Sequence, residues 1–352
     1  MKIYINGRFL TQKLTGVQRY AVEVVKCLSF YKGFELVLLV PKDYSGVLEF
    51  NKICIHKVGF LSGHLWEQLE LPFYSRNGLL INLCNASPLF KREQIVTIHD
   101  ASVFGFPSAY SYLFRTWYKF LLKASKYNAK KVFTVSRFSK SELEKHCGIP
   151  EEKIEAVYLG HEHVVETISN CNIIDKNGLQ RKKYVLAVSS MNPNKNFMSI
   201  INAFNMLSPS EYCLVIAGGF NSRVFEDADV VLPTSVKHVG YVSDAELKAL
   251  YENAGCFIFP SYYEGFGLPP LEAMACGCPV IVANSSSLPE VCGEAALYCN
   301  PYDIKDISQK INLLMNNQEL RRELRRKGLM RVTQFTWEKC AQKLYNQILE
   351  GK

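Results

Sequence analysis

The stretch SYYEGFGLPPLE, residues 261–272, carries two glutamates, Glu264 and Glu272, eight positions apart. Two glycines and two adjacent prolines lie between them. Glycine weakens a helix and proline is tolerated only in its first turn, so this interval cannot form one regular helix. The two acids are therefore expected on different elements of local structure.

The flanking residues 256–284 indicate where those elements lie. Their pattern is typical of a strand, a loop, a helix and a second strand, with the apolar runs CFIF and PVIV at the two ends. Because proline suits a first helical turn and glycine commonly follows a helix, we expect the helix to begin near Pro270 and to stop at Gly277. Glu264 then lies in the loop, and Glu272 lies in the first helical turn.

This loop and helix start suit a ligand that has both phosphates and hydroxyls. Gly265 and Gly267 allow close approach of the backbone to a ligand, and the N–H groups and dipole of a helix start favour an anion. Two carboxylates would repel a bare phosphate, but they accept hydrogen bonds from hydroxyls. A nucleotide sugar offers a diphosphate, a ribose diol and a sugar. The pattern also fits a plain helix start in which Glu272 complements the dipole and Glu264 is solvated.

Length and composition are those of a globular protein. At 352 residues the chain exceeds the size of one hydrophobic core, so two domains are expected. Hydrophobic residues make up 48% and charged residues 21%, and no apolar run is long enough to span a bilayer. The first ten residues lack the apolar core of a secretory signal. Twelve cysteines, several of them within apolar runs, indicate reduced thiols and a cytoplasmic location.

The positive charge is concentrated in the first half of the chain. Residues 1–166 contain 22 basic and 15 acidic side chains, a net charge of +7, out of +8 for the whole protein. An anionic surface or substrate is therefore expected to meet this half.

Short β-rich runs alternate with amphipathic stretches along the whole chain. Buried strands are predicted for the runs FELVLLV, GLLINLC, QIVTIHD, KVFTVS, KYVLAVSS, YCLVIAGG, VKHVGYV, CFIFPS and PVIVAN. Continuous apolar strands separated by helical lengths are typical of βαβ units and a parallel sheet. The predicted fold class is α/β, with two Rossmann-like, doubly wound domains facing each other across a cleft. Such sheets bind ligands at the carboxyl ends of their strands.

Glu264 and Glu272, with GFGLPPLEAMACGCPVI between and after them, resemble the E-x7-E signature of glycosyltransferase family 4, which consists of retaining enzymes of the GT-B fold. The resemblance covers nearly the whole chain. Further segments that carry it are TGVQRYAVEVV (15–25), LWEQLELP (65–72), VTIHDASVFGFP (96–107), VFTVSRFSKSEL (132–143), VSSMNPNKN (188–196), LPEVCGEAALYCNP (288–301) and the closing LRRKGLMRVTQFTWEKCAQKLYNQIL. Several of these resemble the bacterial surface-polysaccharide, O-antigen mannosyltransferase-like branch of the family.

The resemblance implies a division of the chain into domains. Residues 1–166 would form an acceptor-side domain, and a final helix, 337–352, would cross back to it. Residues 184–336 would form the nucleotide-sugar-binding domain. The polar interval at 166–183 interrupts the strand pattern and itself predicts the linker, 167–183.

The resemblance also implies roles for individual residues. Glu264, His99 and Lys195 would be catalytic: Glu264 and His99 at the donor sugar, and Lys195 on the leaving diphosphate. Glu272 would bind the ribose hydroxyls. The remaining donor-binding positions would be Gly16, Ser136, Arg137, Asn196, Gly265, Phe266, Gly267 and Leu268. For His99, Gly16, Ser136 and Arg137, a purely structural strand end or turn remains an alternative.

The chain differs from many family members near the diphosphate, and its two metal-like motifs are incomplete or isolated. Many family members have an arginine shortly before the position of Lys195, whereas this chain has Ser189 and Ser190 there. Lys195 is therefore expected to be the main side-chain cation for the diphosphate. Asp227 and Asp229 form a D-x-D pattern far from the other motifs, and Cys276 with Cys278 lacks a second pair at metal spacing, so no metal and no cofactor are expected.

A basic amphipathic segment occupies residues 110–131. Arg115, Lys119, Lys123 and Lys126 recur at helical spacing and continue to Lys130, with aromatic and leucine residues between them. Such a stripe fits a helix resting on anionic lipid, and it equally fits a solvated face over a buried one. It belongs to no recognised nucleic-acid module.

Together with these patterns, the resemblance implies a retaining, metal-independent hexosyltransferase. Its donor would be a nucleotide-diphosphate sugar, with GDP-mannose favoured. Its acceptor would be a polyprenol-diphosphate-linked oligosaccharide for O-antigen or capsule, reached peripherally at the inner face of the cytoplasmic membrane. The alternatives are a GT-B-fold sugar-nucleotide epimerase and a non-catalytic partner in polysaccharide assembly.

Overall fold

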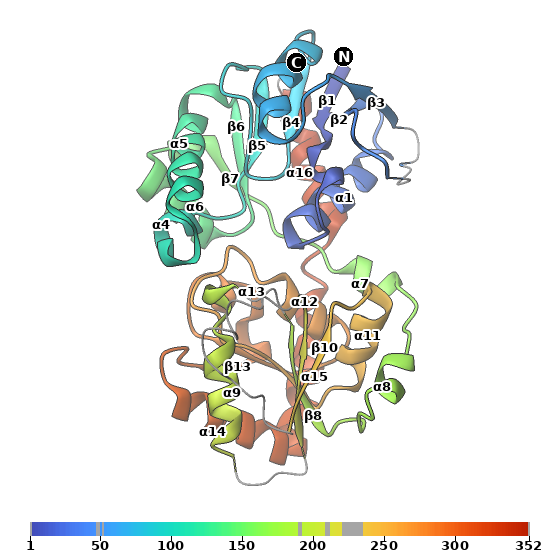
Figure 1. The fold of residues 1–352 in the computed structure, drawn as a ribbon, viewed down its shortest axis with the longest axis vertical. Helices are drawn as coiled ribbons and strands as arrows, with labels where there is room; N and C mark the ends of the chain where they lie inside the picture. Colours follow the sequence, from blue (N-terminus) through green and yellow to red (C-terminus); the bar gives the residue numbers. More distant parts are fainter. Residues whose placement is uncertain are drawn as a thin grey trace. The chain divides into compact units, whose positions relative to one another are not determined.

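The structure, a computed structural model, describes residues 2–46, 50, 53–188, 192–207, 212–219 and 235–350. The chain divides into two compact units. The first comprises Met1–Gly160 together with Thr336–Lys352, and the second comprises His161–Phe335. Each unit is built around its own parallel sheet, with helices packed around the strands (Figure 1).

The described residues of the first unit form a seven-stranded parallel sheet with the order β3-β2-β1-β4-β5-β6-β7. Its strands are β1 (Lys2–Asn6), β2 (Glu35–Pro41), β3 (Cys54–Val58), β4 (Leu79–Asn82), β5 (Gln94–Thr97), β6 (Lys131–Thr134) and β7 (Ile154–Ala156). The central strands β4 and β5 are buried along their whole length, as expected for a sheet covered on both faces.

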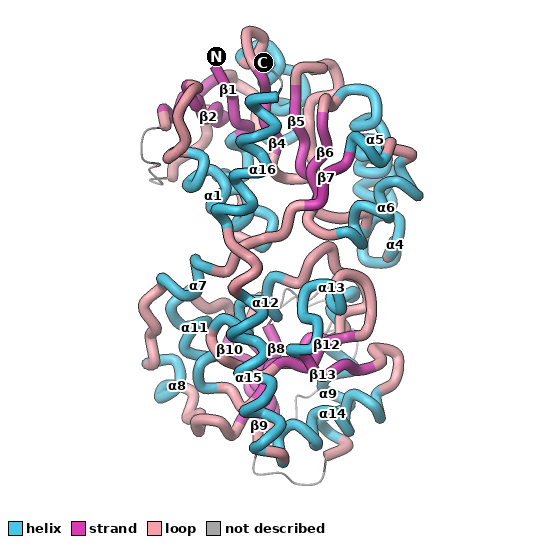
Figure 2. The backbone as a smooth tube through the Cα atoms, turned by 180° about the vertical axis from the view of Figure 1, so that it is seen from behind, coloured by secondary structure: helices cyan, strands magenta, loops and turns pink. Residues whose placement is uncertain are grey.

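The helices of this unit fill the connections between its strands. They are α1 (Gly16–Leu28), α2 (Gly63–Leu65), α3 (Leu71–Tyr74), α4 (Ser102–Gly105), α5 (Tyr112–Asn128), α6 (Arg137–Cys147) and α16 (Trp337–Glu350). Shorter turns are η1 (Gly7–Thr11), a π-helical turn η2 (Trp66–Glu70), η3 (Pro107–Ala109) and η4 (Glu151–Lys153). The final helix α16 lies beside α1, the first helix of the chain, as expected from the sequence (Figure 2).

The described residues of the second unit form a six-stranded parallel sheet with the order β10-β9-β8-β11-β12-β13. Its strands are β8 (Tyr184–Val188), β9 (Cys213–Ala217), β10 (Val236–Gly240), β11 (Cys256–Phe259), β12 (Val280–Ala283) and β13 (Ala296–Cys299). Its helices are α7 (Glu162–Glu166), α8 (Asn172–Lys176), α9 (Phe197–Asn205), α11 (Asp244–Asn253), α12 (Leu268–Ala275), α13 (Leu288–Cys292), α14 (Ile304–Asn316) and α15 (Gln318–Val332), with the turns η5 (Pro193–Lys195) and η6 (Gly293–Ala295). The predicted fold of two doubly wound α/β sheets is confirmed.

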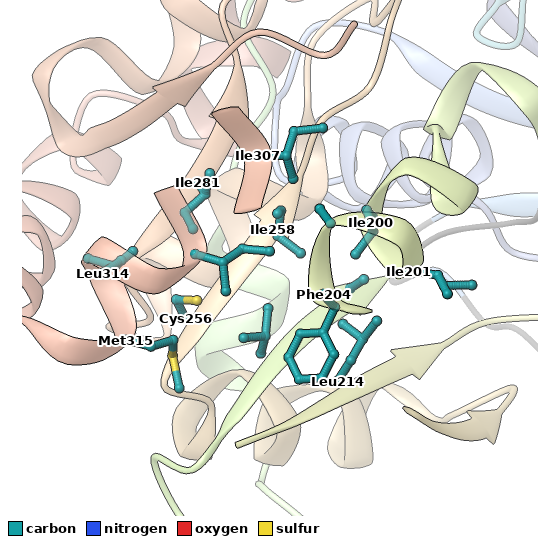
Figure 3. Close-up of a cluster of buried hydrophobic side chains, with 14 of the residues drawn as sticks. Ile200, Ile201, Phe204, Leu214, Cys256, Ile258, Ile281, Ile307, Leu314 and Met315 are labelled. Carbon is teal, nitrogen blue, oxygen red and sulfur yellow. The ribbon is translucent and has the colours of Figure 1, made fainter. Parts of the chain in front are cut away.

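The core of the second unit follows from its apolar strands. Ile258 of β11 and Ile281 of β12 pack with Phe204 of α9 and Leu314 of α14 in one buried cluster. Figure 3 shows these side chains between the sheet and the two helices. Burying such side chains contributes about 1.5–3 kcal/mol each. The cluster fixes the strand ends that carry the candidate site.

The segment 167–183, predicted as a linker, lies within the second unit and contains α8. Its backbone is held by α11, because Lys248 Nζ donates to Thr167 O at 2.8 Å and Asn170 N donates to Ala245 O at 2.9 Å. Lys237 Nζ donates to Asn177 O at 2.7 Å. The chain passes from one unit to the other before this segment, at Gly160.

All twelve cysteines are free thiols. Six of them are buried, and burial raises the pKa of Cys256, Cys292 and Cys299 to about 12. These thiols therefore stay protonated and act as small apolar side chains.

Candidate active site

The candidate site lies at the carboxyl ends of β8 and β11 in the second unit. These strands are neighbours in the sheet, although the chain adds β9 and β10 on one side before β11 on the other. Doubly wound sheets bind their ligands at this kind of switch point. Residues 260–267 follow β11 and contain Glu264, while residues 192–196 come after β8 and contain Lys195.

Lys195 and Glu264 form an ion pair. Lys195 Nζ donates to Glu264 Oε1 at 2.7 Å, and the two side chains are only 20% and 10% exposed. Lys195 Nζ also lies 5.4 Å from the ring centroid of Phe259, the last residue of β11. An ammonium group has three donors and a carboxylate about four acceptor positions, so both groups keep capacity for a ligand. Lys195 and Glu264, which belong to separate predicted segments, are thus in direct contact.

Polar side chains around the loop hold its backbone in place. Asn194 Nδ2 donates to Tyr263 O at 3.1 Å, and Ser287 Oγ donates to the carbonyls of Glu264 at 3.0 Å and Phe266 at 2.8 Å. Because these carbonyls are bonded behind the loop, its conformation is set before a ligand arrives.

Asn196 supports the same loop and was predicted to bind the donor. Its side chain is buried, and Nδ2 donates to Pro260 O at 3.1 Å and Pro301 O at 2.7 Å. This amide nitrogen therefore joins the loop after β11 to the turn after β13. Asn196 therefore acts on the site at least by fixing this backbone, and its predicted role in donor binding stays a prediction.

The helix α12 begins two residues earlier than predicted, at Leu268. Gly267 has φ +102°, and a Cβ on it would lie 2.6 Å from Leu288 Cδ2, so this position requires glycine. The early start moves Glu272 into the second helical turn. Since Pro269 and Pro270 have no N–H, the backbone donors here come from the loop and from Leu268.

Glu272 is held on both carboxylate oxygens. His163 Nε2 donates to Oε1 at 2.9 Å, and the Tyr251 hydroxyl donates to Oε2 at 3.2 Å. Burial raises the pKa of Tyr251 far above its ordinary value, with the Glu272 carboxylate as a further cause, so this hydroxyl remains a donor. Each oxygen of Glu272 retains a lone pair for a further hydroxyl, and the pair could therefore accept both hydroxyls of a diol.

Three buried acceptor or donor atoms border the site without a hydrogen-bond partner among the described residues. They are Asn192 Oδ1, Asn194 Oδ1 and Ser261 Oγ. Buried polar atoms are nearly always bonded, so a cluster of unbonded ones marks a place where a ligand or water supplies the partner. All three belong to the segments that follow β8 and β11.

The loop of residues 260–267 also contacts the last residue of the second unit. Phe266 is buried and meets Phe335 edge-on, with ring centroids 5.9 Å apart. His161 Nδ1 lies 2.7 Å from Phe335 O, which joins the first and last residues of this unit. Gly265 and Leu268 are buried beside Phe266.

His99 of the first unit follows β5 and is buried. Its Nε2 donates to Leu83 O at 2.9 Å, so Nδ1 carries the lone pair, and its backbone N donates to Asn85 Oδ1 at 2.7 Å. Burial lowers the pKa of His99, which keeps the imidazole neutral; the hydrogen bond to Leu83 and the nearby Asp100 act in the opposite direction. A neutral His99 is suited to accepting a hydrogen bond.

Two of the other first-unit positions are exposed, and one is not. Gly16 is the exposed first residue of α1, and Arg137 is the exposed first residue of α6. Ser136 is fully buried, and its Oγ accepts from Ser139 N at 2.9 Å. Ser136 therefore caps α6, and its predicted role in donor binding stays a prediction.

The basic residues of α5 lie against aromatic rings. Lys119 and Lys123 stand over the Phe104 ring at 4.8 and 5.7 Å. Arg115 lies over Tyr112, and Lys126 lies over Tyr127. Four apolar or aromatic side chains of α5 are more than half exposed: Tyr112, Leu113, Phe120 and Tyr127. This helix thus presents mixed cationic and aromatic side chains to solvent.

Some predicted features fall outside the described residues, namely Ser189, Ser190, Asp227 and Asp229. Across the part of the chain that the structure does describe, no three His, Cys, Asp or Glu side chains are grouped as metal ligands. Within the same part, no helix combines the length and apolarity needed to cross a bilayer.

Four side chains that hold the site were not predicted from the sequence: His163, Tyr251, Asn194 and Ser287. Ser287 had a signal, since three serines come one residue after β12, the neighbour of β11 in the sheet. His163 had none, because it lies 109 residues from Glu272.

Two Rossmann-like units, with the candidate site at the switch point of the second, are the architecture of the GT-B fold. Family models agree with this class: glycosyl transferases group 1 matches residues 170–330, and Glycosyltransferase Family 4 matches residues 14–163. The chain therefore belongs to glycosyltransferase family 4, which confirms the resemblance seen in the sequence.

Named relatives and solved structures agree with the family. O-antigen chain mannosyltransferase B of Escherichia coli is 29% identical over 385 residues, covering 98% of this chain and 99% of the relative. O-antigen chain mannosyltransferase RfbU of Salmonella typhimurium strain LT2 is 34% identical over 217 residues, covering 61% of this chain and 58% of the relative. Sucrose-phosphate synthase from Thermosynechococcus elongatus has a TM-score of 0.79 at 18% identity and covers 100% of both chains. Anabaena HepE in complex with UDP-glucose has a TM-score of 0.76 at 16% identity, covering 100% of this chain and 99% of HepE.

Proposed function

We propose that this glycosyltransferase is a retaining, metal-independent mannosyltransferase of O-antigen or capsule synthesis. Its donor is GDP-mannose, and its acceptor is a polyprenol-diphosphate-linked oligosaccharide. The names of two relatives, both O-antigen chain mannosyltransferases, support the sugar and the pathway. The UDP-glucose complex of HepE supports a nucleotide-diphosphate sugar as donor.

The observation that carries the proposal is the Lys195–Glu264 ion pair at the switch point of the second sheet. Lys195 Nζ bonds Glu264 at 2.7 Å and has further N–H groups that would bind the diphosphate. As the glycosidic bond breaks, negative charge develops on that diphosphate, and a fixed cation there lowers the barrier. Glu264 would accept from a sugar hydroxyl, and Glu272 would accept from the ribose.

We propose same-face attack as the chemical step. The bond between C1 of the donor sugar and the diphosphate oxygen breaks while the acceptor oxygen bonds to C1 on the same face. The proton of the acceptor hydroxyl passes to the departing phosphate oxygen. Double displacement would need a second carboxylate close to the first at the reacting carbon, whereas Glu272 is held by His163 and Tyr251 for another hydroxyl pair.

The membrane surface is the proposed place of action. Cationic and exposed aromatic side chains share helix α5, and each basic residue near an anionic surface adds about 1 kcal/mol of attraction. Flotation with phosphatidylglycerol vesicles at low salt should carry the protein upward. A variant with Lys119, Lys123 and Lys126 changed to glutamine should float less. Equal flotation of the two proteins, or none with the wild type, would contradict this role.

Donor turnover tests the enzymatic proposal. The full chain is incubated with a panel of sugar nucleotides, with and without EDTA, and nucleoside diphosphate release is measured. We expect release from GDP-mannose that EDTA leaves unchanged, and an α-linked product from the α-linked donor by NMR. Glu272→Gln should raise the donor KM, while Glu319→Gln, at an exposed position of the same unit, should behave as wild type. An epimerase would interconvert the sugar without releasing nucleotide, and a non-catalytic partner would do neither.

A further inference from the structure

A second group of polar side chains gathers in the first unit, where β1 and β4 end. These strands are neighbours, although the chain adds β2 and β3 on one side of β1 before β4 on the other. This is the switch point of the first sheet, the place where doubly wound sheets bind ligands. Asn6 ends β1 and Asn82 ends β4, and Asn6 Nδ2 donates to Asn82 Oδ1 at 3.0 Å.

A carboxylate is buried at this point. Glu67 is only 2% exposed, and its Oε1 accepts from Asn6 Nδ2 at 2.7 Å and lies 3.4 Å from Arg8 Nε. Glu67 comes from the π-helical turn η2, a geometry frequently found at functional sites. Desolvating a carboxylate and a guanidinium offsets much of their attraction, so such a pair is weak evidence of a purely stabilising role.

Glu67 also orients a histidine that reaches solvent. His64 Nδ1 lies 3.2 Å from Glu67 Oε2, and the His64 side chain is 37% exposed. A carboxylate can only accept, so Nδ1 carries the hydrogen and the lone pair of the neutral ring is on Nε2. The buried network thus fixes both the ring and its tautomer.

Aromatic rings line this histidine. The ring centroids of Trp117 and Tyr118, both from α5, lie 6.3 and 5.8 Å from that of His64, and both meet it edge-on. Burial raises the pKa of the Tyr118 hydroxyl and the charge of Arg8 lowers it, so this hydroxyl lies close to the same network. A few oriented polar groups beside aromatic walls are typical of a small-molecule site.

We propose that this cluster is the acceptor subsite, in which His64 Nε2 accepts a hydrogen bond from one hydroxyl of the acceptor sugar. Glu67 is the positioning residue that fixes the tautomer. Trp117 offers the apolar faces of the sugar a wall. This inference rests on the proposed function, since it names which residues of the first unit recognise the sugar that receives the transferred residue.

Deoxy acceptors test the hydrogen bond. Octyl α-D-mannopyranoside and its four monodeoxy derivatives are offered to the full chain with GDP-mannose, and kcat/KM for the acceptor is measured. With the wild type, one deoxy acceptor should lose roughly 3- to 10-fold, the range for one neutral hydrogen bond. His64→Ala should lose the same factor with the parent acceptor and show no further loss with that deoxy acceptor. His64→Gln, whose amide oxygen can accept, should recover part of the loss.

Controls separate this subsite from a structural role. Acceptor-independent GDP release, the donor KM and the melting temperature should be unchanged in His64→Ala, and His56→Ala, at an exposed position of the same unit, should behave as wild type. Glu67→Gln can donate to Nδ1 and reverse the tautomer, so it should show the same deoxy pattern as His64→Ala.

Two results would overturn the assignment. One is a His64→Ala enzyme with the acceptor kcat/KM of the wild type, and the other is a loss that is equal for the parent and for every deoxy acceptor. Failure of the proposed function would look different, because the wild type would then neither release GDP nor transfer mannose. In that case the 15N signal of His64 Nε2 still reports contact: a shift on adding octyl mannoside supports the subsite, and a constant signal refutes it.

Discussion

Removing the charge of Lys195 should affect stability and turnover by separable amounts. Lys195→Met keeps the aliphatic stem but leaves the Glu264 carboxylate, which is 10% exposed, without its partner at 2.7 Å. Breaking a buried ion pair on one side costs about 3 kcal/mol or more. For a unit of this size, roughly 3 kcal/mol corresponds to a drop in melting temperature of about 6–12 °C.

A double-mutant cycle separates the two effects. In Lys195→Met/Glu264→Gln both members of the pair are neutral, so we expect stability to return to within about 1 kcal/mol of the wild type. Turnover should remain lower by roughly 10²-fold or more, because the cation on the leaving diphosphate is still missing. Urea denaturation measures the first quantity, and GDP release from GDP-mannose at saturating donor measures the second.

The outcome that refutes the reasoning is specific. If Lys195→Met/Glu264→Gln, once its stability is restored, turns over near the wild-type rate, Lys195 acts only through folding. If the single variant Lys195→Met is as stable as the wild type, the Lys195–Glu264 pair is too solvated to matter. A rise in the donor KM with an unchanged kcat would show that Lys195 contributes to donor binding in the ground state.

Three further predictions follow from the geometry. Gly267→Ala, whose Cβ would lie 2.6 Å from Leu288 and whose φ is +102°, should cost about 1–3 kcal/mol and raise the donor KM; a normal KM would show that the loop adapts. Tyr251→Phe removes the hydroxyl that donates to one oxygen of Glu272. The KM for the 2′-deoxyribose analogue, divided by the KM for GDP-mannose, should therefore be smaller than in the wild type. Burial lowers the pKa of His99, so the neutral form stabilises the fold above about pH 6.5 and that stability is lost as the pH falls below it; unfolding free energies at pH 7.5 and 5.5 should differ more in the wild type than in His99→Gln, and equal differences would contradict the shift.

Local patterns in the sequence predict the architecture well. The strand runs, the break after β11 and the helix carrying Glu272 depend on neighbours within a few residues, so alternation and the Gly-Pro signals locate them. The sequence predicts that α12 begins near Pro270, because proline suits a first helical turn. The positive φ of Gly267 instead lets the helix begin at Leu268.

Contacts between distant segments could not be predicted in this way. His163 reaches Glu272 across 109 residues, and Glu67 reaches Asn6 across 61, so nothing in the local pattern of either residue announces its partner. Contacts of Ser136 and Asn196 were equally hidden from the local pattern. Each polar side chain next to a strand end bonds a nearby backbone group, a structural role that stands beside the predicted one in donor binding.

The buried cysteines are natural probes of the unfolding of each unit. Cys256 and Cys292 are fully buried, and burial raises the pKa of each thiol to about 12, so we expect them to react with iodoacetamide only when the second unit opens. Cys147 reports in the same way on the first unit, with its pKa also raised to about 12 by burial. Timed alkylation followed by peptide mass spectrometry would therefore show whether the two halves of this transferase melt together or one after the other, without any introduced label.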